Sequence, residues 1–175
     1  MAATQTVAYD NRQSSVHLQG DPFVAECTLE SDLPLYLPED YVPGSSERVQ
    51  MYREIDALTS DQQLEAYRLH LHDRFGPLPP AADGLLRVPV VRRMARSLGV
   101  ERLVAKSGKL TLYFVSNTDS AYYRSDTFGC VITYSTGHFR TCQLAEHGGK
   151  RRLTVSGVGD INTVLTVLQD IAAAK

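Results

Sequence analysis

The spacing of apolar residues predicts two consecutive amphipathic helices in the first half of the chain. The first runs over residues 46–58 and takes Ser45 or Ser46 as its N-terminal cap. The second runs over residues 60–75 and begins with a capping box that starts at Ser60. Helices joined by so short a turn should form an antiparallel hairpin. Their apolar stripes are Met51, Ile55 and Leu58 in the first, and Leu64, Tyr67, Leu71 and Phe75 in the second.

A third helix is predicted over residues 80–98 and ends at Gly99. Pro89 lies inside this segment, where a proline removes one backbone hydrogen bond and should kink the helix. The expected buried stripe is Leu86, Val90, Met94 and Leu98.

Shorter runs of alternating residues predict strands on both sides of these helices. One strand is expected near residues 26–30. Segments 102–105 and 110–115 flank Ser107–Gly108, a two-residue turn that is typical of a hairpin. A second hairpin is expected over residues 140–156, with paired glycines at its tip.

The remaining segments predict two more helices. Residues 121–134 have a weak helical period, and Asp160 caps a final helix with Val164, Leu165, Leu168 and Ile171 on one face. The expected fold class is therefore α+β, with an N-terminal three-helix region followed by two β-hairpins, and with helices packed on a small antiparallel sheet.

Composition divides the chain into a polar N-terminal segment and one domain. Residues 1–22 are interpreted as a polar tail or the remnant of a linker, and residues 23–175 as a single domain. The formal net charge is −2, so the chain as a whole does not attract nucleic acid or anionic membranes. Its three cysteines form no CxxC motif, which argues against a disulfide framework and favours a reducing, cytoplasmic setting.

Candidate catalytic and metal-binding motifs are weak. His70, His72 and Asp73 are close in sequence, but residues two apart point to different helix faces, so no metal site is predicted. Gly157-Val158-Gly159 precedes a helix but lacks the rest of any phosphate-binding motif, and a plain turn is favoured. No nucleophile motif is present, so the fragment is not predicted to be an enzyme.

Two clusters could instead contact nucleic acid. Arg92, Arg93 and Arg96 form a possible basic contact face, to which Lys150–Arg152 could add. The alternative is that these side chains are solvated or pair with the acidic residues of the first half. Aromatic residues near Arg124 could stack on bases, although packing into a core is the more usual role. These aromatic residues are Tyr122, Tyr123 and Phe128.

Three segments together resemble the C-terminal domain of bacterial transcription-repair coupling factors. They are ECTLESDLPLYLPEDYVPGSSERVQMYREI at 26–55, LEAYRLHLHDRFGPLPP at 64–80 and LLRVPVVRRMARSLGVERL at 85–103. The specific anchors are the proline-bounded turn at 38–43, the residues Arg48, Tyr52 and Arg53, and the run DRFG at 73–76. The resemblance extends over residues 23–173, and YFVSN at 113–117 is similar to the branch found in Bacteroides-like bacteria.

The resemblance implies a regulatory role rather than catalysis. Such factors are ATP-dependent DNA translocases of the bacterial cytoplasm that remove stalled RNA polymerase from lesions and recruit nucleotide-excision repair proteins. ATP and Mg²⁺ belong to their motor domains, and no cofactor is expected in this one. In the family this module contacts an N-terminal module that resembles a repair helicase, and so masks the surface that binds the damage-recognition subunit. Double-stranded DNA and the polymerase would be reached through the parent protein, and no membrane is involved.

The same resemblance assigns the contact to the end of the second helix. The family uses a Glu three residues before an Asp-Arg pair, and these positions correspond here to His70, Asp73 and Arg74. His70 departs from the pattern, so the contact is expected to be weaker or differently paired, and to respond to pH near neutrality. The alternative function is a nucleic-acid-binding accessory module that uses the basic face.

Overall fold

Alternating apolar residues form a five-stranded sheet in the order β1-β2-β3-β5-β4. The computed structural model describes residues 23–174, so the interpretation of residues 1–22 lies outside the described part of the chain. The strands are β1 (Thr28–Ser31), β2 (Val100–Lys106), β3 (Lys109–Phe114), β4 (Cys142–His147) and β5 (Lys150–Ser156).

Both predicted hairpins are present. Ser107 and Gly108 have φ values of 54° and 74°, and Gly148 and Gly149 have 62° and 82°. Positive φ at both central residues is the backbone of the tight turns that match the twist of paired strands. The sheet is nevertheless mixed rather than wholly antiparallel, because β1 pairs with β2 in parallel through the long helical connection between them.

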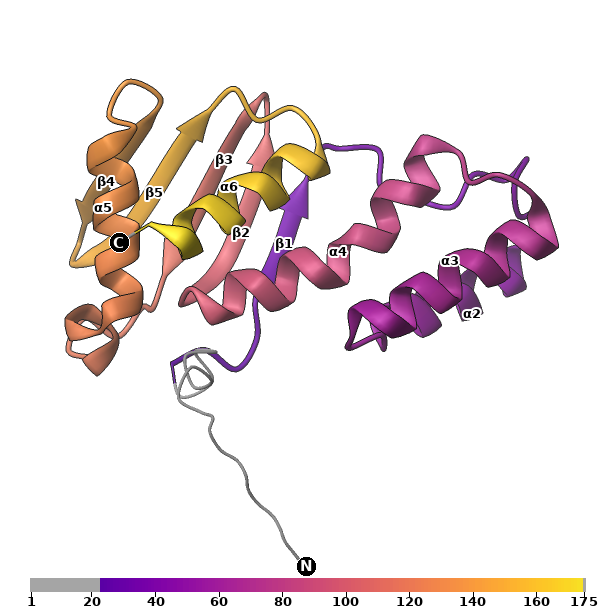
Figure 1. Cartoon of the computed structure of the whole chain (residues 1–175), viewed down its shortest axis with the longest axis horizontal. Coiled ribbons are helices and arrows are strands. Elements are labelled where there is room, and N and C mark those ends of the chain that lie inside the picture. The colour runs from indigo at the N-terminus through magenta and orange to yellow at the C-terminus, as the bar shows by residue number, and fades with distance from the viewer. Residues whose placement is uncertain (1–22, 175) are drawn as a thin grey trace, which may run out of the picture.

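Three helices cover one face of this sheet: α4 (Pro80–Ser97), α5 (Asp126–Gly137) and α6 (Ile161–Ala173). Figure 1 shows them together on the near side of the strands. The apolar strand residues that alternate toward them, such as Leu103, Leu112 and Leu153, are fully buried. These contacts form the larger hydrophobic cluster.

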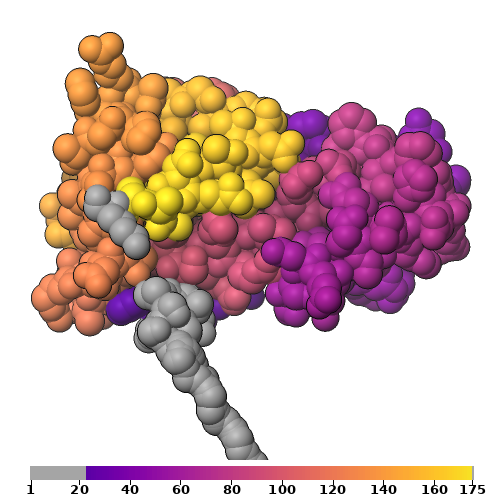
Figure 2. Space-filling view, viewed as in Figure 1, coloured from indigo at the N-terminus to yellow at the C-terminus, as the bar shows by residue number. Residues whose placement is uncertain are grey.

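Helices α2 (Ser45–Asp56) and α3 (Asp61–Phe75) form the predicted hairpin and pack on the N-terminal half of α4. Figure 2 shows them as a lobe beside the sheet and its covering helices. A second, smaller cluster fills this lobe and extends into α4. Its buried members are Leu37, Val42, Met51, Ile55, Leu64, Leu71, Ala82 and Leu86.

The helix starts differ in part from the prediction. Ser60 Oγ accepts a hydrogen bond from Gln63 N at 3.1 Å, so the cap predicted at the start of α3 is confirmed. Gln63 Oε1 accepts from Thr59 N at 2.8 Å, one residue before the cap, so the second bond differs from that of the predicted box. The cap predicted at Ser45 or Ser46 is wrong, because α2 begins after Gly44 without a side-chain cap.

Helix α4 buries more than the single predicted stripe. It contributes Leu86 to the smaller cluster and Val91 and Ala95 to the larger one, whereas Met94 is only partly buried. A helix that packs against two neighbours needs apolar residues on two faces. Pro89 lies inside the helix, as predicted, and the ribbon bends along its length (Figure 1).

The weakly periodic segment 121–134 forms two elements rather than one helix. A 3-10 turn, η2 (Ala121–Arg124), precedes α5, and Ser125 caps α5 by accepting a hydrogen bond from Phe128 N. Tyr122 is fully buried, and its hydroxyl donates to Leu98 O at 2.6 Å. Tyr122 and Phe128 therefore belong to the core and cannot offer a base-stacking platform.

Candidate protein-contact site

The C-terminal end of α3 is fixed by an aromatic pair. Gly76 ends the helix with a φ of 90°. The Tyr41 hydroxyl lies 2.9 Å from Gly76 O and 3.3 Å from Leu71 O, and its ring centroid is 5.6 Å from that of Phe75. The loop before α2 therefore holds the last turn of α3 in place.

Arg74 links this end to the neighbouring helix. Its guanidinium forms an ion pair with Glu47 in the first turn of α2 and lies 4.8 Å from the centroid of the Phe75 ring. The side chain is 53% exposed, so the pair faces solvent and contributes little to folding stability. Arg74 is therefore held over an apolar ring but remains accessible.

His70 lies one turn earlier, beside a cleft of 190 Å³ between α2 and α3. Its ring centroid is 6.1 Å from that of Tyr67, whose hydroxyl donates to Glu54 Oε1 at 2.8 Å. Burial, and then the bond to Glu54, raises the pKa of Tyr67, so this hydroxyl stays protonated as a donor. His70 and Arg74 both line the cleft.

The Asp73 side chain is exposed and forms no hydrogen bond or ion pair with another residue in the range 23–174. His70, Asp73 and Arg74 stand three and four positions apart, so they share one side of the last helical turns. The structure thus brings the three predicted residues together as an exposed set, hereafter the α3-end site. It contains an unpaired carboxylate, an imidazole and a guanidinium.

The three arginines of α4 lie elsewhere and have internal partners. Arg92 Nη1 lies 2.6 Å from Asp56 Oδ1, and its Nε donates to Cys27 O at 3.3 Å. Arg96 Nη1 donates to Ala25 O at 3.1 Å. These residues border a separate cleft of 260 Å³ between the strand entry and α4.

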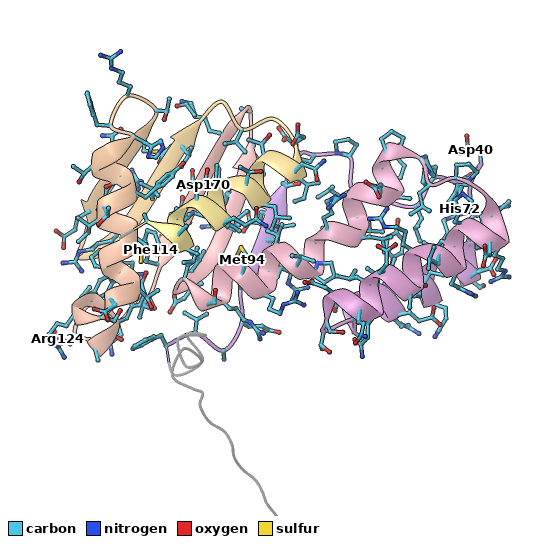
Figure 3. The ribbon with its side chains drawn as sticks, in the orientation of Figure 1. Asp40, His72, Met94, Phe114, Arg124 and Asp170 are labelled. Carbon is cyan, nitrogen blue, oxygen red and sulfur yellow. The ribbon has the colours of Figure 1, made fainter. Side chains whose placement is uncertain are left out.

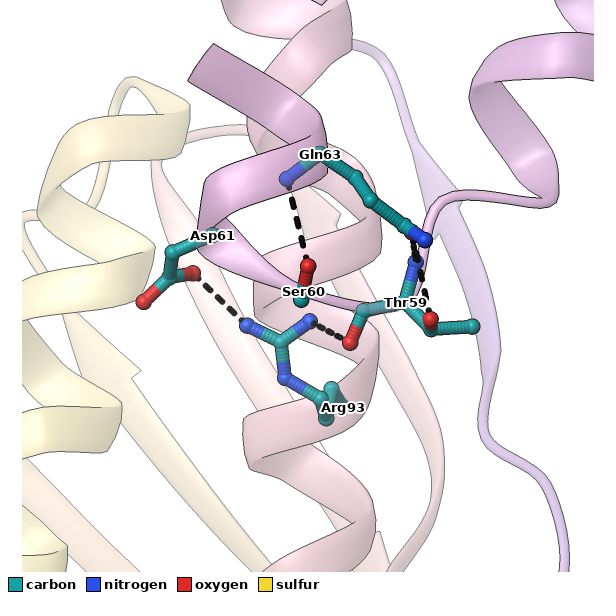
Figure 4. A network of polar contacts seen from close by, with 5 residues as sticks. All are labelled: Thr59, Ser60, Asp61, Gln63 and Arg93. Carbon is teal, nitrogen blue, oxygen red and sulfur yellow. Dashed lines mark hydrogen bonds and ion pairs between the residues drawn. The ribbon is translucent and has the colours of Figure 1, made fainter. Parts of the chain in front are cut away.

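Arg93 bonds to the turn between α2 and α3. Figure 4 shows its guanidinium donating to Thr59 O and to Asp61 Oδ1, both at 2.8 Å, beside the capping box of α3. The three arginines therefore join α4 to the strand entry and to the hairpin. That they also form a basic contact face stays a prediction.

Metal ligation finds no support in the described residues. Among residues 23–174, no group of three or more His, Cys, Asp or Glu side chains is placed to hold a metal ion. Burial raises the pKa of the Cys27 thiol to about 11 despite the opposing effect of Arg92, so this sulfur is a poor nucleophile. No helix in the described range has the length and apolarity needed to cross a membrane.

Comparison with known protein families shows that residues 31–125 match the model of the TRCF domain. The chain is 35% identical over 75 residues to the transcription-repair-coupling factor of Escherichia coli, a match that covers 43% of this chain and 6% of that protein. It is 36% identical over 78 residues to the Mycobacterium bovis factor, with the same 43% and 6% shares. It is 29% identical over 100 residues to the factor of Rickettsia bellii, a match that covers 57% of this chain and 9% of that protein.

The chain belongs to the TRCF domain family. Its fold also matches a crystal structure of the C-terminal domain of a transcription-repair coupling factor, with a TM-score of 0.68 and 19% identity. That match covers 85% of this chain and 92% of the other. The structural match confirms the predicted α+β fold, and the match to the TRCF domain model confirms the family resemblance. The chain corresponds to only a small part of the full-length relatives.

The sequence anchors of the TRCF domain have structural roles in the loop before α2. Tyr52 Oη accepts a hydrogen bond from Leu37 N at 2.8 Å, and Arg48 Nη1 donates to Val42 O at 2.7 Å. This loop carries Tyr41, which fixes the end of α3. These anchors therefore position the α3-end site, and the anchor run at 73–76 supplies two of its residues, Asp73 and Arg74.

Sequence reasoning missed the neighbours of this site on α2. The sequence alone assigns no partner to Glu47 or to Glu54. Both residues approach α3 from a neighbouring helix, so no local spacing indicates the pairs they form. The predicted antiparallel hairpin was the only available signal, because it places the start of α2 opposite the end of α3. It could have suggested that acids of α2 lie opposite Arg74 and Tyr67.

Proposed function

We propose that this chain is the regulatory C-terminal domain of a bacterial transcription-repair coupling factor, and that the α3-end site binds another module of the same protein. The observation that supports this most is Asp73, an exposed carboxylate without a partner among the described residues, beside an arginine held over Phe75. An apolar ring rimmed by charges is a common interface pattern.

The proposed partner is the N-terminal, repair-helicase-like module of the parent protein. Contact between this domain and that module would cover the surface that recruits the damage-recognition subunit and would restrain the motor. Removal of stalled RNA polymerase, translocation on DNA and hydrolysis of ATP with Mg²⁺ would be carried out by other parts of the parent in the bacterial cytoplasm. This domain would act without chemistry of its own.

The charges suggest how such a contact opens and closes. Arg74 is paired with Glu47, and a partner carboxylate could replace Glu47 at little cost because the pair is exposed. Asp73 could accept a hydrogen bond from a partner arginine, and the two ring nitrogens of His70 offer a further polar contact. Such a contact would be sensitive to salt.

Calorimetric titration of this chain into the N-terminal module, at low and at high salt, tests the proposal. We expect saturable binding that weakens with salt and falls at least about tenfold in Asp73→Ala, since truncating one partner of a charge pair at an interface costs this much or more. The Asp73 side chain is exposed and forms no hydrogen bond or ion pair with another described residue, so its replacement should leave the fold intact.

The matched control is Arg124→Ala combined with Asp126→Ala. It removes one exposed pair of charges, and Arg124 lies at the opposite end of the molecule from His72 (Figure 3). In the intact parent, Asp73→Ala with Arg74→Ala should raise both repair-subunit binding and ATPase activity. Equal affinity for wild type, Asp73→Ala and the control, with both parent activities unchanged, would refute the assignment.

A further inference from the structure

One face of the sheet is not covered by any helix among residues 23–174. The strand residues alternate, and Leu103, Leu112 and Leu153 point to the side that carries α4, α5 and α6. Their neighbours point to the other side, where Thr111 and Thr154 remain partly exposed at the centre of the sheet. We call this side the open face.

The strand register collects basic residues on the open face. Arg102, Tyr113 and Arg152 lie in one row across β2, β3 and β5, while Lys106 and Lys109 are paired two rows away. Lys150 is two residues before Arg152, on the same side of β5. All five basic side chains are exposed.

Few acids oppose them. Glu30 is the strand carboxylate that pairs with these residues, with Arg102 at 2.8 Å and with Lys106 at 4.0 Å. Asp32 follows β1 and accepts a hydrogen bond from Ser107 N. Both acids lie at the β1 edge, so the positive charge is concentrated over β3 and β5.

The other two carboxylates on the described strands, Glu101 and Glu146, form no ion pair with these five basic residues. Glu146 pairs with Arg151, whose guanidinium lies 4.4 Å from the Tyr123 ring centroid. Glu101 lies at the irregularity near the start of β2 and accepts a hydrogen bond from Ser116 Oγ at 3.4 Å. Lys109, Lys150 and Arg152 therefore have no ion-pair partner within the described part of the chain.

We propose that the open face binds the phosphate backbone of double-stranded DNA. A seven-residue strand is roughly 23 Å long, and duplex DNA carries a charge about every 1.7 Å along its axis. The face is a sheet surface with a neutral centre of Val104, Thr111 and Thr154 and with basic residues around it. Point charges distributed in this way suit phosphates and carry no sequence information.

The composition of the face disfavours single strands and protein partners. Single-strand binders stack bases on exposed aromatic rings, but the one aromatic residue here, Tyr113, lies under the Arg102 guanidinium at 4.9 Å. A protein interface would need an apolar centre poor in lysine, whereas three of the five basic residues are lysines. This site is separate from the α3-end site.

Fluorescence anisotropy with a labelled duplex of random sequence tests the proposal, using the full chain at about 50 and about 200 mM salt. The test variant is Lys109→Glu with Arg152→Glu. The control is Arg124→Glu with Arg140→Glu, which makes the same change in charge at exposed residues outside the open face. We expect at least about a tenfold loss in the test variant, a shallower salt dependence, and less than about a twofold loss in the control.

Circular dichroism should show that both variants are folded, since the four replaced side chains are exposed. Asp73→Ala should bind the duplex like the wild type, so failure of the two proposals can be told apart. The inference is overturned if no saturable duplex binding occurs at the lower salt, or if test and control variants lose affinity equally. It is also overturned if a single strand or polyglutamate competes as well as the duplex does.

Discussion

At the scale of single residues, Gly99 shows how one position without a side chain permits the core to close. It follows α4 with a φ of 82°, and a Cβ there would lie 2.1 Å from Cε1 of the Tyr122 ring. Tyr122 cannot move away easily, because it is fully buried and its hydroxyl bonds to Leu98 O. A side chain at Gly99 therefore meets both a steric and a conformational penalty.

Gly99→Ala should lower the free energy of unfolding by at least about 3 kcal/mol, because overpacking adds to the cost of positive φ. Urea denaturation measures this change. Gly108→Ala is the matched control: its φ is 74°, but nothing lies within 4 Å of its Cβ position, so a loss of only about 1 kcal/mol is expected. Equal losses in the two variants would mean that the Tyr122 contact contributes nothing.

At the scale of elements, the two helices of the hairpin begin in different ways, although serines lie at the start of both. Ser60→Ala should cost about 1 kcal/mol of unfolding free energy, because Ser60 Oγ satisfies Gln63 N at the start of α3. Ser46→Ala should change stability by less than about 0.5 kcal/mol, since Ser46 lies inside α2, which has no side-chain cap. Thermal or chemical unfolding of the two variants checks this, and a larger loss in Ser46→Ala would contradict the observed helix start.

The same comparison shows what the sequence could predict. The turn at Ser107–Gly108 and the helix cap at Ser60 are encoded within a few residues, and the structure confirms both. The start of α2 was wrong because the sequence offers serines but the backbone turns at Gly44. Local spacing cannot distinguish a serine that caps a helix from one that follows its first residue.

Contacts between residues that are far apart in the chain could not be predicted from the sequence. The Arg74–Glu47 pair requires the hairpin, and the parallel pairing of β1 requires the whole helical connection. The basic residues of the open face come from three strands, so only the register brings Arg102, Lys109 and Arg152 to one side. The sequence instead drew attention to consecutive arginines on α4, which the structure engages internally.

At the scale of the whole molecule, the two hydrophobic clusters predict unequal local stability. Leu71 is fully buried in the smaller cluster and Leu153 in the larger one, so each change to Ala should cost about 2–5 kcal/mol. In hydrogen exchange, Leu71→Ala should speed exchange mainly in α2 and α3, whereas Leu153→Ala should speed it throughout the sheet. Uniform acceleration by Leu71→Ala would show that the molecule opens only as one unit.

Helix α4 belongs to both clusters, with Leu86 in one and Val91 in the other. A chain cut before this helix would separate β1 and the hairpin of α2 and α3 from the rest of the sheet. A cut after it would separate the other four strands from one of their covering helices. Recombination between genes could therefore exchange the lobe and the sheet only together. The α3-end site and the open face would be inherited as one piece, even if they serve different partners.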